Sequence, residues 1–163
     1  MLWTVTTSPI GELAVAADDA GLCRVRFSPH DVTADPAAAG AAPLARAVEQ
    51  LAAYFAGELT EFDLPLSVRG GSDFERAVWA ALRDIPYGEM RTYGEIAVRA
   101  GDPGAARAVG VACNRNPLAL VVPCHRVVGA GGKLVGFGGG LDRKRHLLEL
   151  ESGVAMRQLW AAS

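Results

Sequence analysis

The chain has 163 residues, half of them apolar, and a formal net charge of −2. This length is enough to bury one sizeable core or two small ones. No uncharged apolar run is long enough to span a bilayer, and the first residues lack the basic-then-apolar order of a secretory signal, so we expect a cytoplasmic protein without a membrane partner. Three cysteines without close spacing, Cys23, Cys113 and Cys124, argue against a disulfide framework and a zinc site, and we expect no metal.

Charge is unevenly distributed along the chain. Residues 1–70 contain 4 Lys and Arg against 9 Asp and Glu, whereas residues 71–163 contain 12 against 9. A partner that carries phosphates is therefore expected to approach the C-terminal half, because neutralising phosphates supplies most of the sequence-independent affinity for nucleic acids. Many proteins without such a partner show an excess of this size, so the motifs must decide.

The start of the chain has the alternating pattern of short strands. We expect strands over residues 3–7 and 13–16, separated by a turn. A third strand follows a glycine. Cys23, Val25 and Phe27 share one face of it, so we expect Cys23 to lie in the core.

A loop and then a helix are expected next. Residues 28–43, rich in Ala, Asp, Pro and Gly, are typical of an exposed loop. Apolar side chains then repeat at helical spacing, at Leu44, Val48, Leu51 and Phe55, and Gly57 is a natural stop. Residues 62–68 resemble a strand or an extended connector, and residues 69–71 resemble a linker into the second half.

Two capping boxes mark helices in the second half. A Ser-x-x-Glu box at residues 72–75 opens a helix that ends at a Pro-Tyr-Gly turn. Its apolar stripe consists of Phe74, Val78, Leu82 and Ile85. A Thr-x-x-Glu box at residues 92–95 opens a short helix over residues 93–100, and Pro103 opens another through about Cys113. Two short helices joined by a tight turn predict a helix-turn-helix.

The second helix of this pair carries almost only small side chains. Arg107 projects among alanines such as Ala106, so the helix backbone could approach a DNA minor groove while Arg107 enters the duplex. Ordinary recognition helices instead carry several long polar side chains for the major groove. A helix packed tightly against its neighbours has the same composition, so both interpretations stay open at this point.

A cysteine followed by a histidine, Cys124 and His125, lies after an apolar run and a proline. A thiol is a strong nucleophile only as the thiolate, and a neighbouring base or positive charge favours that form. Cys124 is therefore a candidate nucleophile, and a buried structural thiol is the alternative. Glu151 is on the apolar stripe of a C-terminal helix that also carries Leu147. A carboxylate there needs a partner, unless it only caps the solvated end of the helix.

These residues resemble the O6-alkylguanine-DNA alkyltransferases, also called methylated-DNA–protein-cysteine methyltransferases. The resemblance covers most of the chain, is weak over the first 70 residues and is dense from Phe74 to Glu151. Its ordered motifs are Ile85-Pro86-Tyr87-Gly88, Thr92-Tyr93-Gly94-Glu95-Ile96-Ala97, Ala105-Ala106-Arg107-Ala108-Val109-Gly110, Asn114-Arg115-Asn116-Pro117, Pro123-Cys124-His125-Arg126-Val127 and Arg143-Lys144-x-x-Leu147-Leu148-x-x-Glu151. Such a series at family spacing is a stronger signal than the cysteine pentapeptide alone.

The resemblance implies DNA repair by direct, irreversible, single-turnover transfer of the alkyl group from O6-alkylguanine in duplex DNA to Cys124. O4-alkylthymine is a second candidate substrate. In this family His125 would take the thiol proton through a water, and Glu151 would hold the imidazole in the needed tautomer. Asn116 would connect the helix-turn-helix to the active-site segment through side-chain hydrogen bonds. No cofactor is implied.

The resemblance also implies a set of residues that bind DNA and a flipped base. Tyr93 would lie near the target phosphate and the flipped base, and Arg107 would fill the gap left in the stack. The remaining expected contacts come from Ala106, Arg126, Val127, Phe137 and Gly138. Phe137 departs from the family pattern, because most relatives have a tyrosine there, whose hydroxyl can stabilise the leaving oxygen.

We expect an α/β (α+β) fold in two parts. Residues 1–70 would form a small sheet with a flanking helix, a ribonuclease-H-like domain. Residues 71–163 would form a helical, winged-helix-like domain with the helix-turn-helix and the alkyl acceptor. Double-stranded DNA is the expected partner, with no obligate protein partner and a monomeric state. The alternatives are a module that recognises damage without repairing it, a cysteine hydrolase that turns over repeatedly, and a transcription regulator.

Overall fold

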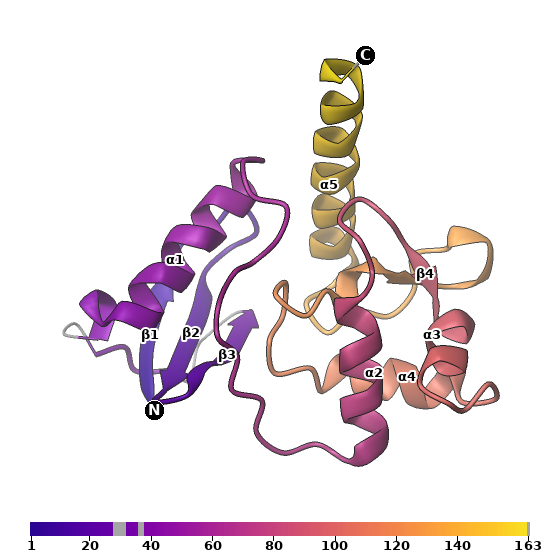
Figure 1. Ribbon diagram of the computed structural model, residues 1–163, viewed down its shortest axis with the longest axis horizontal. Coiled ribbons are helices and arrows are strands. Elements are labelled where there is room, and N and C mark those ends of the chain that lie inside the picture. The colour runs from indigo at the N-terminus through magenta and orange to yellow at the C-terminus, as the bar shows by residue number, and fades with distance from the viewer. Residues whose placement is uncertain (28–31, 36–37, 163) are drawn as a thin grey trace. The chain divides into compact units, whose positions relative to one another are not determined.

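The computed structural model describes residues 1–27, 32–35 and 38–162. The chain divides into two compact units, Met1–Gly70 with Pro117–Val121, and Gly71–Asn116 with Val122–Ser163 (Figure 1). Within the described parts of the chain, no helix combines the length and the apolar character needed to cross a membrane. A small sheet and a set of helices give the mixed α/β architecture that the sequence predicts.

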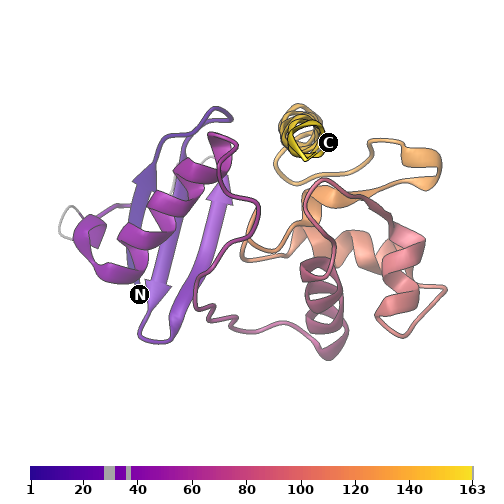
Figure 2. The ribbon, with the colours of Figure 1, turned by 45° about the horizontal axis from the view of Figure 1, so that its top comes forward.

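The first unit is a three-stranded antiparallel sheet with one helix across a face of it (Figure 2). Its strands are β1 (Leu2–Thr6), β2 (Leu13–Asp18) and β3 (Gly21–Phe27), in that spatial order. The central strand β2 is the most buried, because it pairs on both edges. Cys23 is fully buried, as predicted. The predicted loop over residues 28–43 lies partly outside the described residues.

Helix α1 (Ala42–Phe55) forms where the periodicity predicts it, but two of the four predicted positions of its buried face move by one residue, from Val48 to Ala47 and from Phe55 to Tyr54. The buried side chains are Leu44, Ala47, Leu51 and Tyr54. Tyr54 stacks on Phe62 with ring centroids 5.5 Å apart, and Phe55 meets the Tyr54 ring edge-on. The prediction of Phe55 as the last core position was wrong, because an aromatic partner outside the helix selects Tyr54.

Asp18 ties the end of β2 to the connector that leaves the first unit. Its carboxylate accepts hydrogen bonds from Ser67 Oγ and Arg69 Nε, each at 2.7 Å, and from two backbone amides of the next turn. These contacts, with the Ser67 hydroxyl the largest, lower the pKa of Asp18 to about 2 although its desolvation opposes them. Leu66 adds a β-bridge to Leu22. Residues 62–68 are therefore an extended connector, one of the two predicted states.

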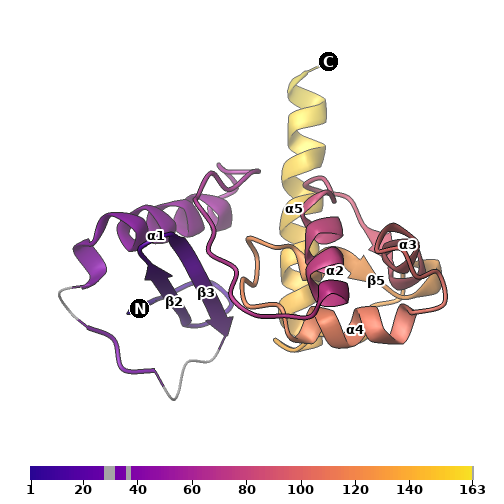
Figure 3. The same cartoon turned by 60° about the horizontal axis from the view of Figure 1, so that its bottom comes forward.

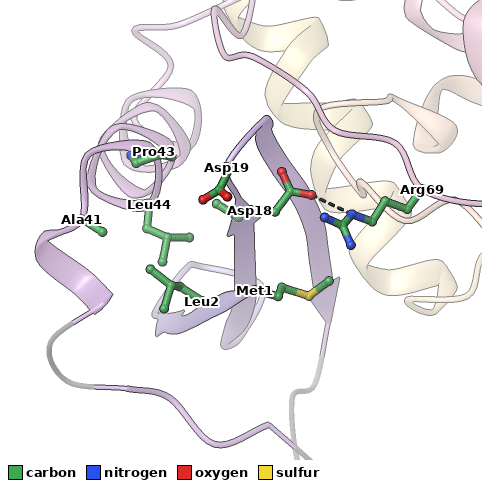
Figure 4. A pocket seen from close by; sticks show the side chains of 9 residues that line it. Met1, Leu2, Asp18, Asp19, Ala41, Pro43, Leu44 and Arg69 are labelled. Carbon is green, nitrogen blue, oxygen red and sulfur yellow. Dashed lines mark hydrogen bonds and ion pairs between the residues drawn. The ribbon is translucent and has the colours of Figure 1, made fainter.

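A cavity of about 430 Å³ lies beside this carboxylate in the first unit (Figure 4). The side chains of Leu2, Pro43 and Leu44 line one part of it, and Asp19 and the Asp18–Arg69 ion pair lie at another. The acid–base pair already satisfies its own charges. The cavity contains none of the residues to which the sequence analysis assigns chemistry.

The second unit consists of four helices and a two-stranded parallel sheet (Figure 3). The helices are α2 (Asp73–Arg83), α3 (Tyr93–Arg99), α4 (Ala106–Asn114) and α5 (Leu141–Ala161), and the strands are β4 (Arg91–Thr92) and β5 (Val127–Val128). Both predicted capping boxes are present, with reciprocal side-chain and backbone bonds at the starts of α2 and α3. Its core includes Val78, Leu82, Ile96, Val109 and Leu147.

Two details of the second unit differ from the sequence prediction. Helix α4 begins at Ala106 rather than near Pro103, because residues 102–105 form a turn in which the Ala105 amide donates to Asp102 O. The β4–β5 pair was not predicted, since each strand has only two residues and shows no alternation. It nevertheless joins the start of α3 to the segment that follows His125.

The apolar run before Cys124 belongs to the first unit. Its Pro117 carbonyl accepts a hydrogen bond from Val25 N at 2.9 Å, and its Ala119 amide donates to Val25 O at 3.3 Å, so the run pairs with β3. Leu120 has a φ of 72°, a left-handed conformation that is uncommon for a residue with a side chain. In the second unit, Asn116 Nδ2 donates to Val122 O at 2.8 Å, which connects the residue directly before this run to the residue directly after it.

Candidate active site

Cys124 lies at the start of a short 3-10 turn, Cys124–Arg126, directly before β5. The preceding Pro123 has φ −82° and ψ 68°, and the Cys124 amide bonds back to Val122 O at 2.8 Å. This tight turn brings the side chains of Cys124, His125 and Arg126 one after another, whereas a strand would point successive side chains to alternate faces. All three are buried, and Cys124 is 7% exposed.

Glu151 from α5 binds both residues that follow the cysteine. Its Oε2 lies 2.6 Å from His125 Nε2, and its two oxygens accept hydrogen bonds from Arg126 Nε at 2.7 Å and Nη2 at 3.1 Å. The Gly88 amide adds a contact of 3.3 Å, and Arg126 Nη1 binds Ile85 O. The inward position that the sequence predicts for Glu151 is confirmed, and the carboxylate has the partners that a buried charge requires.

The charges of this network assign the tautomer of His125. Burial alone raises the pKa of Glu151, but the bonds from His125 and Arg126 outweigh it and lower that pKa to about 2. The carboxylate is therefore an acceptor at neutral pH, so His125 Nε2 must carry the proton that lies between them. Burial, with Arg126 nearby, lowers the pKa of His125 although Glu151 raises it. A neutral imidazole results, with Nδ1 as its free lone pair.

The orientation of His125 suits a base. No residue in the described part of the chain is a hydrogen-bond partner for its Nδ1. Burial raises the pKa of the Cys124 thiol, while a hydrogen bond from Asn116 and the charge of Lys144 lower it. A protonated thiol next to a neutral imidazole can react once the proton moves toward Nδ1.

A surface pocket of about 350 Å³ lies between α3, α4 and the loop before α5. The structure brings three predicted DNA-binding residues together here, Tyr93, Ala106 and Arg107. The other lining residues were not predicted: Gly110, Val111, Asn114, Val135 and Gly136. Arg107 is exposed on one face of α4. The opposite face, where Val109 and Ala112 are buried, is the one that packs against the rest of the unit.

The sequence analysis quoted Lys144 in a family motif but gave it no role. Its side chain is 0% exposed, and its Nζ donates to Val135 O at 3.2 Å and to Gly136 O at 3.3 Å. The ammonium lies over the rings of Tyr93 and Phe137, 5.6 and 5.8 Å from their centroids. The helical spacing of residues 144, 147 and 151 is the signal that could have revealed this buried position.

Two predicted contacts with DNA or substrate take a different place. Arg126 points into the molecule as the partner of Glu151, and a guanidinium held by a buried carboxylate is not available to a phosphate, so its assignment as a DNA contact is corrected. The Val127 side chain is fully buried in β5, which leaves only its backbone for a ligand. Phe137 is half-buried beside Lys144, and a Cβ on Gly138 would lie 3.6 Å from Asn114 Oδ1.

Comparison with known proteins assigns the family. Residues 73–153 match the 6-O-methylguanine DNA methyltransferase DNA binding domain, and residues 1–68 match the ribonuclease-like domain of the same family. A methylated-DNA–protein-cysteine methyltransferase of Mycolicibacterium paratuberculosis is 60% identical over 148 residues, 88% of each chain. One of Methanosarcina acetivorans is 49% identical over 154 residues, 93% of this chain and 98% of the relative.

Solved structures agree. The crystal structure of Mycobacterium tuberculosis OGT in complex with DNA has a TM-score of 0.84 and 52% sequence identity, with 94% of each chain covered. A structure of the Mycobacterium tuberculosis O6-methylguanine methyltransferase has a TM-score of 0.81, with 93% of each chain covered. Both domain matches, the sequence relatives and these structures lead to one assignment. The chain belongs to the 6-O-methylguanine DNA methyltransferase family.

Proposed function

We propose that this protein repairs DNA by transferring the alkyl group from O6 of guanine to Sγ of Cys124, once per molecule. The observation that carries the proposal is the buried His125–Glu151 pair, which leaves Nδ1 of the residue next to the cysteine as a lone pair. A nucleophile, an adjacent base and a third group that orients the base are the parts that nucleophilic catalysis needs.

The transfer is a displacement at the alkyl carbon. The Cys124 proton moves to His125 Nδ1 through an intervening water, the S–C bond forms, and the bond between carbon and O6 breaks. The electron pair of that bond stays on the guanine, which leaves as an anion and takes up a proton at a ring nitrogen from water. Glu151 stabilises the imidazolium that results, and Arg126 fixes the carboxylate in place. A thioether has no easy reversal, so the protein is consumed.

The pocket beside α4 is the proposed entry for the extruded base. Its small lining residues allow the helix backbone to approach a minor groove, and the exposed Arg107 would occupy the space of the extruded nucleotide. An alkylated guanine pairs weakly, which lowers the free energy needed to extrude it. Tyr93 would contact the base or its phosphate. Its hydroxyl lies 3.1 Å from the carbonyl oxygens of Val135 and Gly136, which wall the same pocket.

The loop before α5 bears on the range of substrates. Phe137 retains an apolar wall but lacks the hydroxyl that a tyrosine would offer to the leaving oxygen. Glycine amides at Gly136 and Gly138 remain as donors to O6, and the same donors suit O4 of an alkylated thymine. We propose O6-alkylguanine as the main substrate and O4-alkylthymine as a second one.

Monomeric action in a reducing compartment such as the cytoplasm completes the proposal. A free nucleophilic thiol persists where thiols stay reduced, and all three cysteines are free. Residues 1–70 would act as a ribonuclease-H-like structural domain and residues 71–163 as the DNA-binding and alkyl-acceptor domain.

The test is the intact mass of the protein after incubation with an excess of duplex DNA that bears one O6-methylguanine. We expect a gain of one methyl group that stops at one equivalent and maps to Cys124, and no gain for Cys124→Ser. Tight binding without a mass change would instead indicate a recognition module. If the protein neither binds the DNA nor gains mass, the result would instead favour a cysteine hydrolase.

A further inference from the structure

One face of α4 borders the pocket that is the proposed entry for the extruded base. Residues 107, 110, 111 and 114, which helical spacing brings onto this face, all line the pocket. Val111 lies in the middle of them and is 52% exposed, and Val135 lines the same pocket from the loop before α5 and is 44% exposed. Single exposed valines are ordinary on a protein surface, but two that line one binding pocket point to a partner with apolar groups.

The polar side chains of this face offer donors to a ligand. Arg107 carries only N–H groups. Asn114 also carries an acceptor, but a Cβ on Gly138 would lie 3.6 Å from its Oδ1, so this oxygen lies against the loop. In the minor groove, A·T and T·A pairs present only acceptors, whereas a G·C pair adds the 2-amino donor of guanine. The four residues of this face, all of them described, therefore suit the acceptors of A·T pairs and turn no side-chain acceptor toward a guanine amino group.

Helical geometry sets how far Val111 lies from the extruded nucleotide. Val111 follows Arg107 by four residues, which is about 6 Å along the helix axis. Neighbouring base pairs of duplex DNA are about 3.4 Å apart. With Arg107 in the space of the extruded nucleotide, the Val111 side chain therefore meets the first or second base pair beside the lesion.

We propose that Val111 is a specificity-determining residue, which lies against the minor-groove edge of a base pair next to the lesion and selects against a guanine 2-amino group there. Its methyl groups exclude the water that binds this amino group in free DNA and leave the donor without a partner, a loss that a pair without the amino group does not suffer. Lesions with A·T neighbours are then bound more tightly and repaired faster than lesions with G·C neighbours. The proposal rests on the function proposed above and extends it to the neighbouring sequence.

The test compares duplexes that bear one O6-methylguanine and differ only in one base pair beside it. The pair is G·C, I·C or A·T, placed in turn at the first and second positions on either side. Inosine is guanosine without the 2-amino group, so the I·C pair isolates that group. At the contacted position, we expect the G·C duplex to react about tenfold more slowly than the I·C duplex in single-turnover transfer, the effect of one buried unpaired donor, and the A·T duplex to match I·C.

Val111→Thr is the informative variant, because it keeps the shape of the side chain and adds a hydroxyl oxygen that accepts a hydrogen bond from the amino group. The G·C and I·C rates should then agree within about twofold. Val111→Ala, which lets water reach the amino group, should reduce the difference as well. Val98→Thr is the matched control, since it makes the same change at a 59% exposed valine of α3 that does not line the pocket, and it should keep the full difference.

The variants also separate this role from the stability of the DNA. A G·C pair opens less readily than an I·C pair, so duplex stability alone slows extrusion beside G·C, and it does so equally for every protein variant. Circular dichroism checks that each variant is folded. The inference is overturned if the wild type shows no difference between G·C and I·C at any position, or if Val111→Thr and Val111→Ala both keep the wild-type difference.

Binding separates this inference from the proposed function. Cys124→Ser lacks the thiol that accepts the alkyl group, so its affinity for the same duplexes is measured by fluorescence anisotropy. If the wild type takes no methyl group, but Cys124→Ser prefers the I·C duplex and adding Val111→Thr removes that preference, the function fails and the role of Val111 stands. If the wild type takes the methyl group at one rate from all duplexes, the function stands and the role of Val111 fails.

Discussion

The ion pair between Glu151 and Arg126 gives the most quantitative prediction. The Glu151 carboxylate accepts bonds from His125 Nε2, from two nitrogens of Arg126 and from the Gly88 amide. With a pKa of about 2 it is ionised at pH 7. Glu151→Gln removes the negative charge and turns an N–H donor toward the donors of Arg126. An uncompensated buried guanidinium then remains, which costs about 3 to 5 kcal/mol of the free energy of unfolding.

The assay is urea unfolding at pH 7, followed by circular dichroism, for four proteins in a double-mutant cycle. We expect Arg126→Met combined with Glu151→Gln to be no less stable than Glu151→Gln alone, because the double variant buries neither charge. The coupling energy should reach about 2 kcal/mol or more. Glu149→Gln, at an exposed position of the same helix, should change stability by less than about 0.5 kcal/mol.

Additive effects would refute this reasoning. If the two single losses sum to the double loss within about 0.5 kcal/mol, the pair is not coupled, and the geometry around Glu151 has been interpreted wrongly. A loss from Glu149→Gln as large as that from Glu151→Gln would show that the charge of α5, rather than the buried contact, decides stability.

Three further predictions concern the linker, the DNA-binding helix and the pocket wall. Gly71→Ala should lower the free energy of unfolding by at least about 2 kcal/mol, because its φ is +86° and a Cβ would lie 2.6 Å from the Trp79 ring. Gly70→Ala, with a φ of +75° and open space around a Cβ, should lower it by only about 1 kcal/mol in the same urea assay. Arg107→Ala should slow transfer from duplex DNA by roughly 10- to 100-fold without slowing transfer from the free O6-methylguanine base, and equal losses with both substrates would contradict its role in base extrusion. Phe137→Tyr should raise the single-turnover rate about fivefold, the equivalent of one hydrogen bond of about 1 kcal/mol to the leaving oxygen, and an unchanged rate would show that the glycine amides are sufficient.

Local sequence patterns predicted most of the helices and the three strands of the first unit, but not the short strands β4 and β5. The capping boxes at the starts of α2 and α3 were predicted and are present, because a Ser or Thr and a Glu three residues later satisfy backbone amides without outside help. The inward position of Glu151 was also predicted, since helical periodicity alone assigns residues to a face. In α1 the same rule placed the core at Phe55 instead of Tyr54, because Phe62, outside the helix, selects the buried aromatic.

The sequence by itself therefore determined most element types and the inward position of Glu151, because each depends on residues close in the chain or on one helical face. The tertiary structure decided how distant segments meet. Arg126 binds a carboxylate 25 residues away, the Lys144 ammonium lies over two aromatic rings and donates to a loop carbonyl, and the run before Cys124 pairs with Val25. The physical reason is that the partners of a buried charge or of an unpaired strand edge come from whichever element packs against it, and no local pattern in the chain specifies that element.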